Sequence, residues 1–216
     1  LMKEALQTMN IPILTMEGYE ADDILGTVAK RCQAEGIEVS VVSGDRDLLQ
    51  LADTHIKIRI PKTSKGSTQI YDYYPEDVKE QYQVTPTEFI DVKALMGDTS
   101  DNIPGVPSIG EKTATNLIVS YGSIENAYAH VDEIKPPRAQ KALSEYYDMA
   151  QMSKELATIC ITCPIPFSYE EALIGNLYTP EAFKFMKRME FKSILNRFDS
   201  ASMEDKENGP QKSFKE

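Results

Sequence analysis

Acidic side chains gather in three short groups of this sequence, and their types and spacing suit the binding of hard cations. The first group lies in GYEADD, the second in SGDRD and the third in GDTSD. Carboxylate oxygens are the ligands that Mg²⁺ and Mn²⁺ prefer in proteins. Two such ions about 4 Å apart can hold the attacking water and the leaving oxygen of a phosphodiester in line. The candidate ligands are Glu20, Asp22, Asp23, Asp45, Asp47, Asp98 and Asp101.

Each acidic group, taken alone, has a simpler explanation. Asp and Glu are favoured at helix N-termini, where free amides and the helix dipole stabilise a negative charge. Three groups in one crevice are harder to explain in this way, because seven like charges would repel each other unless cations neutralised them. The sequence therefore predicts two divalent ions and phosphodiester hydrolysis, which is the chemistry of a nuclease.

The elements that must position the first two groups alternate between helix and strand. Such alternation indicates a parallel α/β sheet, in which loops at the carboxyl ends of the strands line the ligand crevice. The second strand is nearly continuous in apolar residues, which predicts burial on both faces. In chain order we expect a helix at 1–9, a strand at 11–15, a helix at 21–34, a strand at 37–43, a short helix ending at 51, and strands at 55–60 and 69–73 joined by a PKTSKGST loop.

The third acidic group opens a glycine-rich hairpin, IPGVPSIGEKTA, which follows a helix that starts at a capping box in TPTE. Gly105 and Gly110 allow positive-φ turns. A second helix starting at Glu111 would leave the amides of residues 110–112 unpaired and ready for a phosphate. This arrangement resembles the helix-hairpin-helix element, which grips nucleic-acid backbones without reading bases. An ordinary loop with a turn motif is the alternative.

The remainder of the second half reads as helical, with helices expected at 123–131, 137–147, 149–159 and 179–199. Arg138 and Lys141 are candidate phosphate contacts, but a solvated helix face explains them better. The polar stretch at 200–216 predicts a disordered linker. The expected organisation is an acidic α/β core over 1–100, a helical subdomain over 101–199, and the linker over 200–216.

Composition narrows the class of protein. The 216 residues, 41% hydrophobic and 26% charged, describe a globular protein, and no apolar run is long enough to cross a bilayer. A net charge of −11 argues against nucleic-acid binding unless the acids hold metal ions, which reverse the local field. Cys32, Cys160 and Cys163 suit a reducing compartment, and the CxxC pair lacks the partners of a zinc set. We expect a cytoplasmic monomer without membrane association.

Three motifs, GYEADDILGTVAKR, VVSGDRDLLQL and ALMGDTSDNIPGVPSIGEKTATNLI, resemble those of the 5′–3′ exonuclease domain of bacterial DNA polymerase I, in the flap endonuclease superfamily. The likeness runs over residues 1–199. It implies that Glu20 and Asp22 bind a first metal ion, and that the other candidate acids complete the first and second metal sites. It also implies a K⁺ ion among the hairpin carbonyls, and an Arg46 that contacts the scissile strand unless it pairs with a neighbouring acid. The residues that match the family's phosphate-holding hairpin are Gly105, Gly110, Lys112 and Thr113.

The chain also departs from the family pattern. In the family an aspartate-bearing first strand, a second aspartate and a basic helical arch all precede the position that Leu1 matches. The resemblance therefore implies a truncated fragment with a PIN-like, resolvase-like α/β core. Its parallel sheet lacks the first strand, and a helix-hairpin-helix subdomain follows. In the family, the terminal linker leads to a polymerase region.

The main hypothesis is a structure-specific 5′ nuclease of DNA replication and repair that hydrolyses DNA at a 5′ flap or in a nicked duplex. It would use two Mg²⁺ ions, for which Mn²⁺ can substitute. Two alternatives stay open. One is a non-catalytic DNA-binding module that grips duplex phosphates through the hairpin, because the fragment lacks part of the metal shell. The other is a PIN-like ribonuclease, which shares the acidic crevice but not the hairpin.

Overall fold

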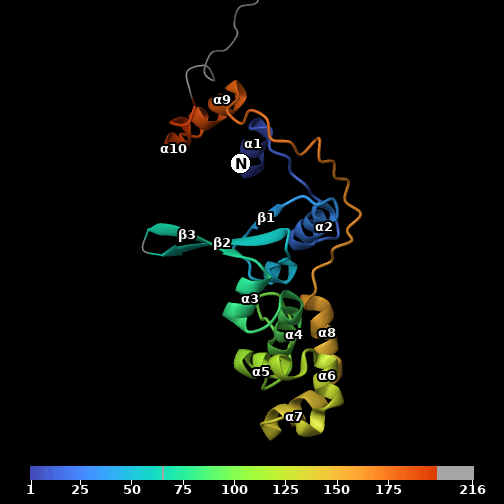
Figure 1. Ribbon diagram of the computed structural model, residues 1–216. Helices are drawn as coiled ribbons and strands as arrows, with labels where there is room; N and C mark the ends of the chain where they lie inside the picture. The colour runs from blue at the N-terminus through green and yellow to red at the C-terminus, as the bar shows by residue number, and fades with distance from the viewer. Residues whose placement is uncertain (65, 199–216) are drawn as a thin grey trace, which may run out of the picture. The chain divides into compact units, whose positions relative to one another are not determined.

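The computed structural model describes residues 1–64 and 66–198 of the chain. The chain divides into two compact units, which can be followed by colour in Figure 1. The larger unit comprises Glu17–Cys163, and the smaller joins Leu1–Met16 to Pro164–Glu216. The expected linker at 200–216 lies outside the described residues.

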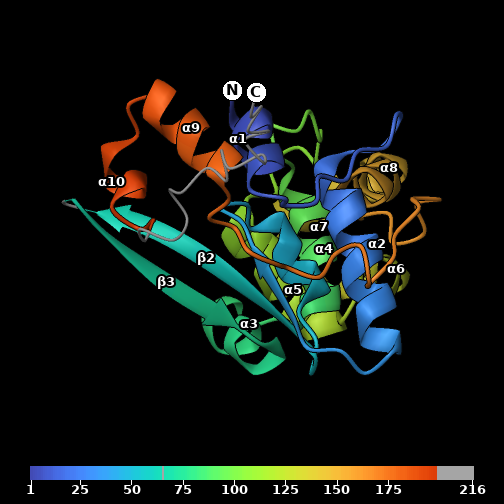
Figure 2. The same ribbon diagram turned by 90° about the horizontal axis from the view of Figure 1, so that it is seen from above.

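The larger unit contains a three-stranded sheet in the order β1-β2-β3. β1 (Val39–Val42) runs parallel to β2 (Ile56–Ser64), with Val39 opposite Ile56. β3 (Ser67–Tyr73) runs antiparallel to β2, and the two strands form the long ribbon seen in Figure 2. The expected parallel pairing is therefore correct for the first pair of strands, while the second pair is a hairpin that makes the sheet mixed.

Three local predictions about strands are wrong. Residues 11–15 form no strand and belong to the smaller unit; Pro12 has no amide hydrogen to give to a ladder. β1 is not buried on both faces, since Val41 is buried but Val42 is 63% exposed. The PKTSKGST segment is not a separate loop, because the pairing of β2 with β3 continues through it to a turn that contains Gly66 at φ +81°.

Helices make up most of the remainder of the larger unit, and they lie close to where the sequence predicts them, except for two unpredicted helices at Pro75–Tyr82 and Val131–Glu133. Their apolar faces share one core with the sheet, to which Leu48, Ile58 and Leu95 contribute fully buried side chains. The bounds are α2 (Ala21–Ala34), the 3-10 helix η1 (Asp47–Leu51), α3 (Pro75–Tyr82), α4 (Pro86–Met96), α5 (Glu111–Tyr121), α6 (Ile124–Ala129), the 3-10 helix η2 (Val131–Glu133), α7 (Pro137–Glu145) and α8 (Tyr147–Ala157).

Helix α4 packs against η1, α5 and α8, and so links the sheet side of the larger unit to its helical side. It begins with the predicted capping box, in which the Glu88 amide donates to Thr85 Oγ1 at 3.3 Å and the Thr85 amide donates to Glu88 Oε2 at 2.8 Å. Two charged side chains of α4, Asp91 and Lys93, are buried. Lys154 of α8 lies 2.7 Å from Asp91, and this ion pair ties the two helices together.

The smaller unit is a cluster of the helices α1 (Met2–Thr8), α9 (Pro180–Arg188) and α10 (Lys192–Leu195). Ala5 of α1 and Phe185 of α9 belong to its apolar core. The helical segment predicted at 179–199 is thus present as two short helices, of which α9 packs on α1 and α10 packs on α9. Within the described ranges, every helix is too short or too polar to cross a lipid bilayer.

Candidate metal and nucleic-acid site

The structure brings the three acidic groups together in the larger unit. Glu20, Asp22 and Asp23 lie at the start of α2, Asp45 and Asp47 follow β1, and Asp98 and Asp101 follow α4. Six of these acids line a small cavity of about 120 Å³, and Asp98 lines the neighbouring cavity of about 730 Å³. Asp45, Asp47 and Asp101 line both cavities, so the acids form one continuous site.

The part of the acid cluster nearest α2 carries negative charge that no described side chain neutralises. The acids that form no ion pair with any described residue are Glu20, Asp22, Asp23 and Asp45. Burial, followed by the charges of Asp45 and Asp47, raises the pKa of Asp22 from 3.8 to about 6. Asp23 is held by amides instead, since the N–H groups of Cys160 and Glu20 donate to its carboxylate at 2.8 and 3.1 Å.

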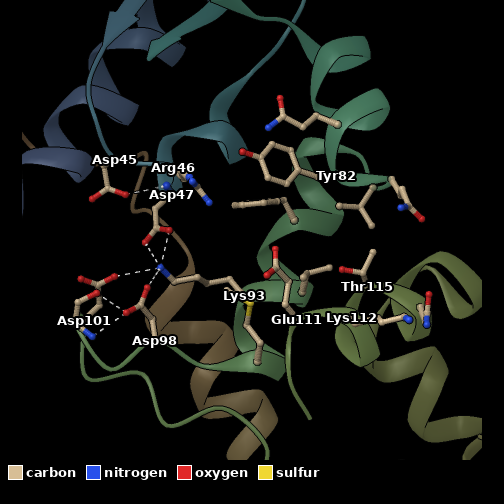
Figure 3. A pocket seen from close by; sticks show the side chains of 18 of the residues that line it. Asp45, Arg46, Asp47, Tyr82, Lys93, Asp98, Asp101, Glu111, Lys112 and Thr115 are labelled. Carbon is tan, nitrogen blue, oxygen red and sulfur yellow. Dashed lines mark hydrogen bonds and ion pairs between the residues drawn. The ribbon is translucent and has the colours of Figure 1, made fainter. Parts of the chain in front are cut away.

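The other part of the cluster surrounds Lys93, a residue that the sequence analysis did not identify. Its Nζ atom lies 2.7 and 2.8 Å from the two carboxylate oxygens of Asp47, in contact with Asp98, and 3.2 Å from Asp101 (Figure 3). The side chain of Lys93 is only 8% exposed. A single ammonium group therefore neutralises part of the charge of three candidate metal ligands.

Lys93 and the acids around it shift one another's pKa values. Burial by itself lowers the pKa of Lys93, but the hydrogen bonds that its ammonium group donates to Asp47 and Asp98 outweigh burial and raise the pKa above its usual value. Lys93, and then Ser100, hold the pKa of Asp98 well below its usual range. Burial raises the pKa of Asp47 in spite of the lysine. One sequence signal could have revealed Lys93: it is the only charged residue in the VKALM run that ends α4.

Two glycines shape the hairpin that carries Asp98 and Asp101. Gly97 and Gly105 have φ values of +72° and +67°, and a Cβ atom on Gly105 would lie 2.5 Å from the backbone nitrogen of Gly97. The predicted positive φ at Gly110 is wrong: its φ is −97°, since it is the N-cap of α5, and Ser108 takes the left-handed conformation instead at φ +72°. Of the two glycines expected to take a positive φ, only Gly105 does so.

The first turn of α5 faces the same large cavity as the acids. The amides of residues 110–112 find no acceptor within the described chain, whereas the Thr113 amide donates to the Gly110 carbonyl at 2.9 Å. The amide of Gly105 is also engaged, because it donates to Ser153 Oγ at 3.1 Å. Glu111 and Lys112 line the cavity of about 730 Å³ with Asp45 and Asp47. A phosphate bound at α5 would thus lie in the cavity that the acids reach.

Arg46 lines the large cavity and forms no ion pair with any described residue, so the predicted alternative of a salt bridge to a neighbouring acid is wrong. Arg138 donates to Ser108 Oγ at 3.1 Å, and Lys141 lies 3.6 Å from Glu145 on the same helix. Arg46 is therefore better placed than either of them to meet an anionic ligand near the acids.

The chemistry of the donor set agrees with a hard divalent cation. Every candidate ligand is a carboxylate, and burial together with the charges of nearby acids raises the pKa of Asp22. Within the described chain, however, no group of three or more Asp, Glu, His or Cys side chains has the geometry of a formed metal site. Cys160 and Cys163 form no disulfide. The described side chains thus supply the donors, but part of the donor set is held by Lys93.

The fold and the site define an α/β core with acids at the ends of its elements, joined through α4 to a hairpin and a helical region. Two family models match these two parts. The 5′-3′ exonuclease N-terminal resolvase-like domain matches residues 1–83, and the 5′-3′ exonuclease C-terminal SAM fold matches residues 84–179. The chain belongs to the 5′–3′ exonuclease family, as its motifs predict.

Individual relatives agree with this assignment. The chain is 44% identical over 205 residues to DNA polymerase I of Bacillus caldotenax. The matched region covers 95% of this chain but only 23% of that protein. A structure of T5 5′-exonuclease with bound zinc ions is 25% identical, has a TM-score of 0.60, and covers 69% of this chain and 53% of that one. The flap endonuclease of bacteriophage T5 in a complex with DNA and metal ions, 23% identical with a TM-score of 0.60, shares the fold over 89% of this chain and 65% of its own.

Proposed function

We propose that this chain is the 5′ nuclease part of a DNA polymerase I and hydrolyses phosphodiester bonds of DNA at or near a 5′ end or flap. The observation that carries the proposal is the meeting of seven carboxylates and the free first turn of α5 at two cavities that share lining residues. Family membership supports a nuclease, and the divalent ions in the T5 5′-exonuclease structure support a metal-dependent one.

Two groups of residues would hold the metal ions. The ligands of the first are Glu20, Asp22, Asp23 and Asp45, and those of the second are Asp47, Asp98 and Asp101. Bound Mg²⁺, or Mn²⁺ in its place, supplies an activated water and neutralises charge on the phosphate oxygens. Asp22 must lose its proton for this, so cation binding weakens as the pH falls below about 6.

The remaining residues of the site would bind and orient the DNA. The amides of residues 110–112 and the Lys112 side chain are placed to hold a backbone phosphate, and Arg46 is placed to hold another nearer the acids. Such contacts select duplex structure and not base sequence, because phosphates are the same at every base. A K⁺ ion among the hairpin carbonyls, between Gly105 and Gly110, would add to this grip.

The chain spans 23% of the Bacillus caldotenax polymerase that it matches. We therefore propose that the activity belongs to a longer protein in which a polymerase region accompanies the nuclease. A division by role into an acidic core over 1–100 and a helical DNA-binding part over 101–199 is part of this proposal; it differs from the two compact units, which are Glu17–Cys163 and Leu1–Met16 with Pro164–Glu216.

A cleavage assay tests the proposal. The 216-residue chain is incubated with a 5′-flapped DNA duplex and Mg²⁺, beside a double variant, Asp98→Ala with Asp101→Ala. Cleavage near the flap junction that needs Mg²⁺ and is lost in the double variant is the expected result. A matched control carries Asp132→Ala and Asp148→Ala, two exposed acids on helices outside the cluster, and should cleave like the parent.

A second function has one observation in its favour. Since no formed metal site exists among the described residues and Lys93 holds three of the acids, the chain could act as a DNA-binding module alone. Tight binding of the flapped duplex without any Mg²⁺-dependent cleavage would replace the nuclease by this module. Preferential cleavage of single-stranded RNA would instead point to a PIN-like ribonuclease.

A further inference from the structure

Lys93 is bound as a metal ion would be. Both oxygens of Asp47, one oxygen of Asp98 and one of Asp101 are directed at its Nζ atom, at distances up to 3.2 Å. The three acids come from two separate parts of the chain, the start of η1 and the hairpin after α4. The lysine is therefore the centre on which these carboxylates converge (Figure 3).

A divalent ion and the ammonium group cannot both use these oxygens. They carry like charges, and a cation ligated by the same carboxylates would lie within a few ångströms of Nζ, where repulsion in a poorly solvated site is strong. The lysine has space to withdraw, since Lys93 also lines the cavity of about 730 Å³. Its four-carbon stem allows the head group to move while the backbone of α4 stays in place.

We propose that Lys93 is the resident counter-ion of Asp47, Asp98 and Asp101, and that a divalent ion binds this group only by displacing the ammonium. The identity of that ion as a metal cofactor rests on the proposed function. Displacement lowers the affinity for the metal, because the exchange must break hydrogen bonds that the lysine already makes. The four acids near α2 have no such competitor among the described residues, so they should bind a divalent ion more tightly.

Calorimetric titration with Mn²⁺, without DNA, tests this exchange on the whole 216-residue chain. The decisive variant is Lys93→Met, which keeps the length and apolar stem of the side chain but removes the charge. The weaker of the divalent binding steps should tighten by at least about tenfold in this variant. Lys93→Gln is measured beside it and should show the same direction, so the test does not depend on one substitution folding.

Lys154→Met is the matched control. Lys154 is also a partly buried lysine held by two acids of the larger unit, at 2.7 Å from Asp91 and 2.9 Å from Glu125, but it lies outside the acid cluster. Its loss should leave Mn²⁺ affinity unchanged. A Lys93→Met chain that folds only when Mn²⁺ is present also supports the exchange, because the metal ion then takes the place of the lysine.

Unchanged or weaker Mn²⁺ binding in both Lys93 variants, with normal binding in the parent, would overturn the exchange and leave the proposed nuclease intact. Lys93 would then merely orient the carboxylates. Absence of Mn²⁺ binding in the parent and in every variant would overturn the metal-dependent function itself, and the exchange with it.

Discussion

The two parts of the acid cluster differ in how their charge is balanced. Asp22, among the acids near α2, has its pKa raised to about 6, whereas the pKa of Asp98 is held well below its usual range. The residues are of the same type and line neighbouring cavities. The difference has two causes: Asp22 is buried among other acids, whereas Asp98 is hydrogen-bonded by Lys93, which does not reach Asp22. One part of the site thus carries negative charge without a cationic partner among the described residues, and the other contains an internal cation, Lys93.

Backbone hydrogen bonds, not charge, hold Asp23 in place near the start of α2. The segment that follows α8 is tied down by Gln50, whose side chain donates to the Ala157 carbonyl at 2.9 Å and accepts from the Ile159 amide at 3.0 Å. In the same segment, the Cys160 amide donates a hydrogen bond to the Asp23 carboxylate. Such neutral contacts fix the position of a carboxylate without neutralising its charge.

The largest effect is expected from breaking the hairpin that brings acids to Lys93. Gly105→Ala should lower the free energy of unfolding by about 3 kcal/mol, because the new Cβ would meet the backbone at Gly97 and the residue has a positive φ. Urea denaturation measures this. Gly110→Ala, where φ is negative and the space is open, should cost less than about 1 kcal/mol. Equal losses in the two variants would contradict the close approach of the two glycines.

The second-largest effect is expected from removing the charge of Lys93. Lys93→Met should destabilise the metal-free chain by about 2 kcal/mol, since it leaves three carboxylates facing each other, two of them partly exposed and therefore screened. Thermal unfolding with and without Mg²⁺ checks this, and Mg²⁺ should restore most of the loss. Lys154→Met should also destabilise the chain, but without rescue by Mg²⁺; rescue of both variants would show that the recovery is not specific to the site.

Neutralising an acid near α2 should stabilise the metal-free chain, whereas removing Lys93 should destabilise it. The raised pKa of Asp22 means that its ionisation costs stability above pH 3.8, with the full cost reached above about pH 6. Asp22→Asn should therefore stabilise the metal-free chain by about 1 kcal/mol at pH 8, after allowance for solvent screening, and raise Tm by about 2–4 °C. The gain should shrink as the pH falls through 6 towards 4. Asp132→Asn, at an exposed acid, is the control, and a gain that is independent of pH would argue against the electrostatic cause.

The smallest effect is expected at Lys112, an exposed residue in the first turn of α5. Lys112→Ala should reduce the slope of log affinity for duplex DNA against log salt by about 1, as expected when one phosphate contact is lost. Fluorescence anisotropy at several salt concentrations, in Ca²⁺ to prevent cleavage, measures the slope. Lys141→Ala removes a lysine that is paired with Glu145 and should leave the slope unchanged. A reversed outcome would place the DNA on α7.

Local sequence signals determined much of the scaffold. The capping box at Thr85, the helix boundaries of α2 and α4, and the glycine at the end of α4 follow from contacts between residues a few positions apart, which the sequence displays directly. The same holds for the three acidic groups, because each lies where a predicted strand or helix begins or ends. Their meeting at connected cavities follows from the α/β pattern.

Pairings over long distances in the sequence were decided by the tertiary structure alone. Residues 11–15 have the composition of a strand but form none, since composition does not supply a neighbouring strand. The left-handed turn fell on Ser108 instead of Gly110, because the surrounding hairpin sets that φ. Lys93 is a charged residue in an apolar run of the sequence, but its partner is identified only when Asp47, 46 positions earlier, is folded against it. Charge balance depends on distances in space, and those exist only after folding.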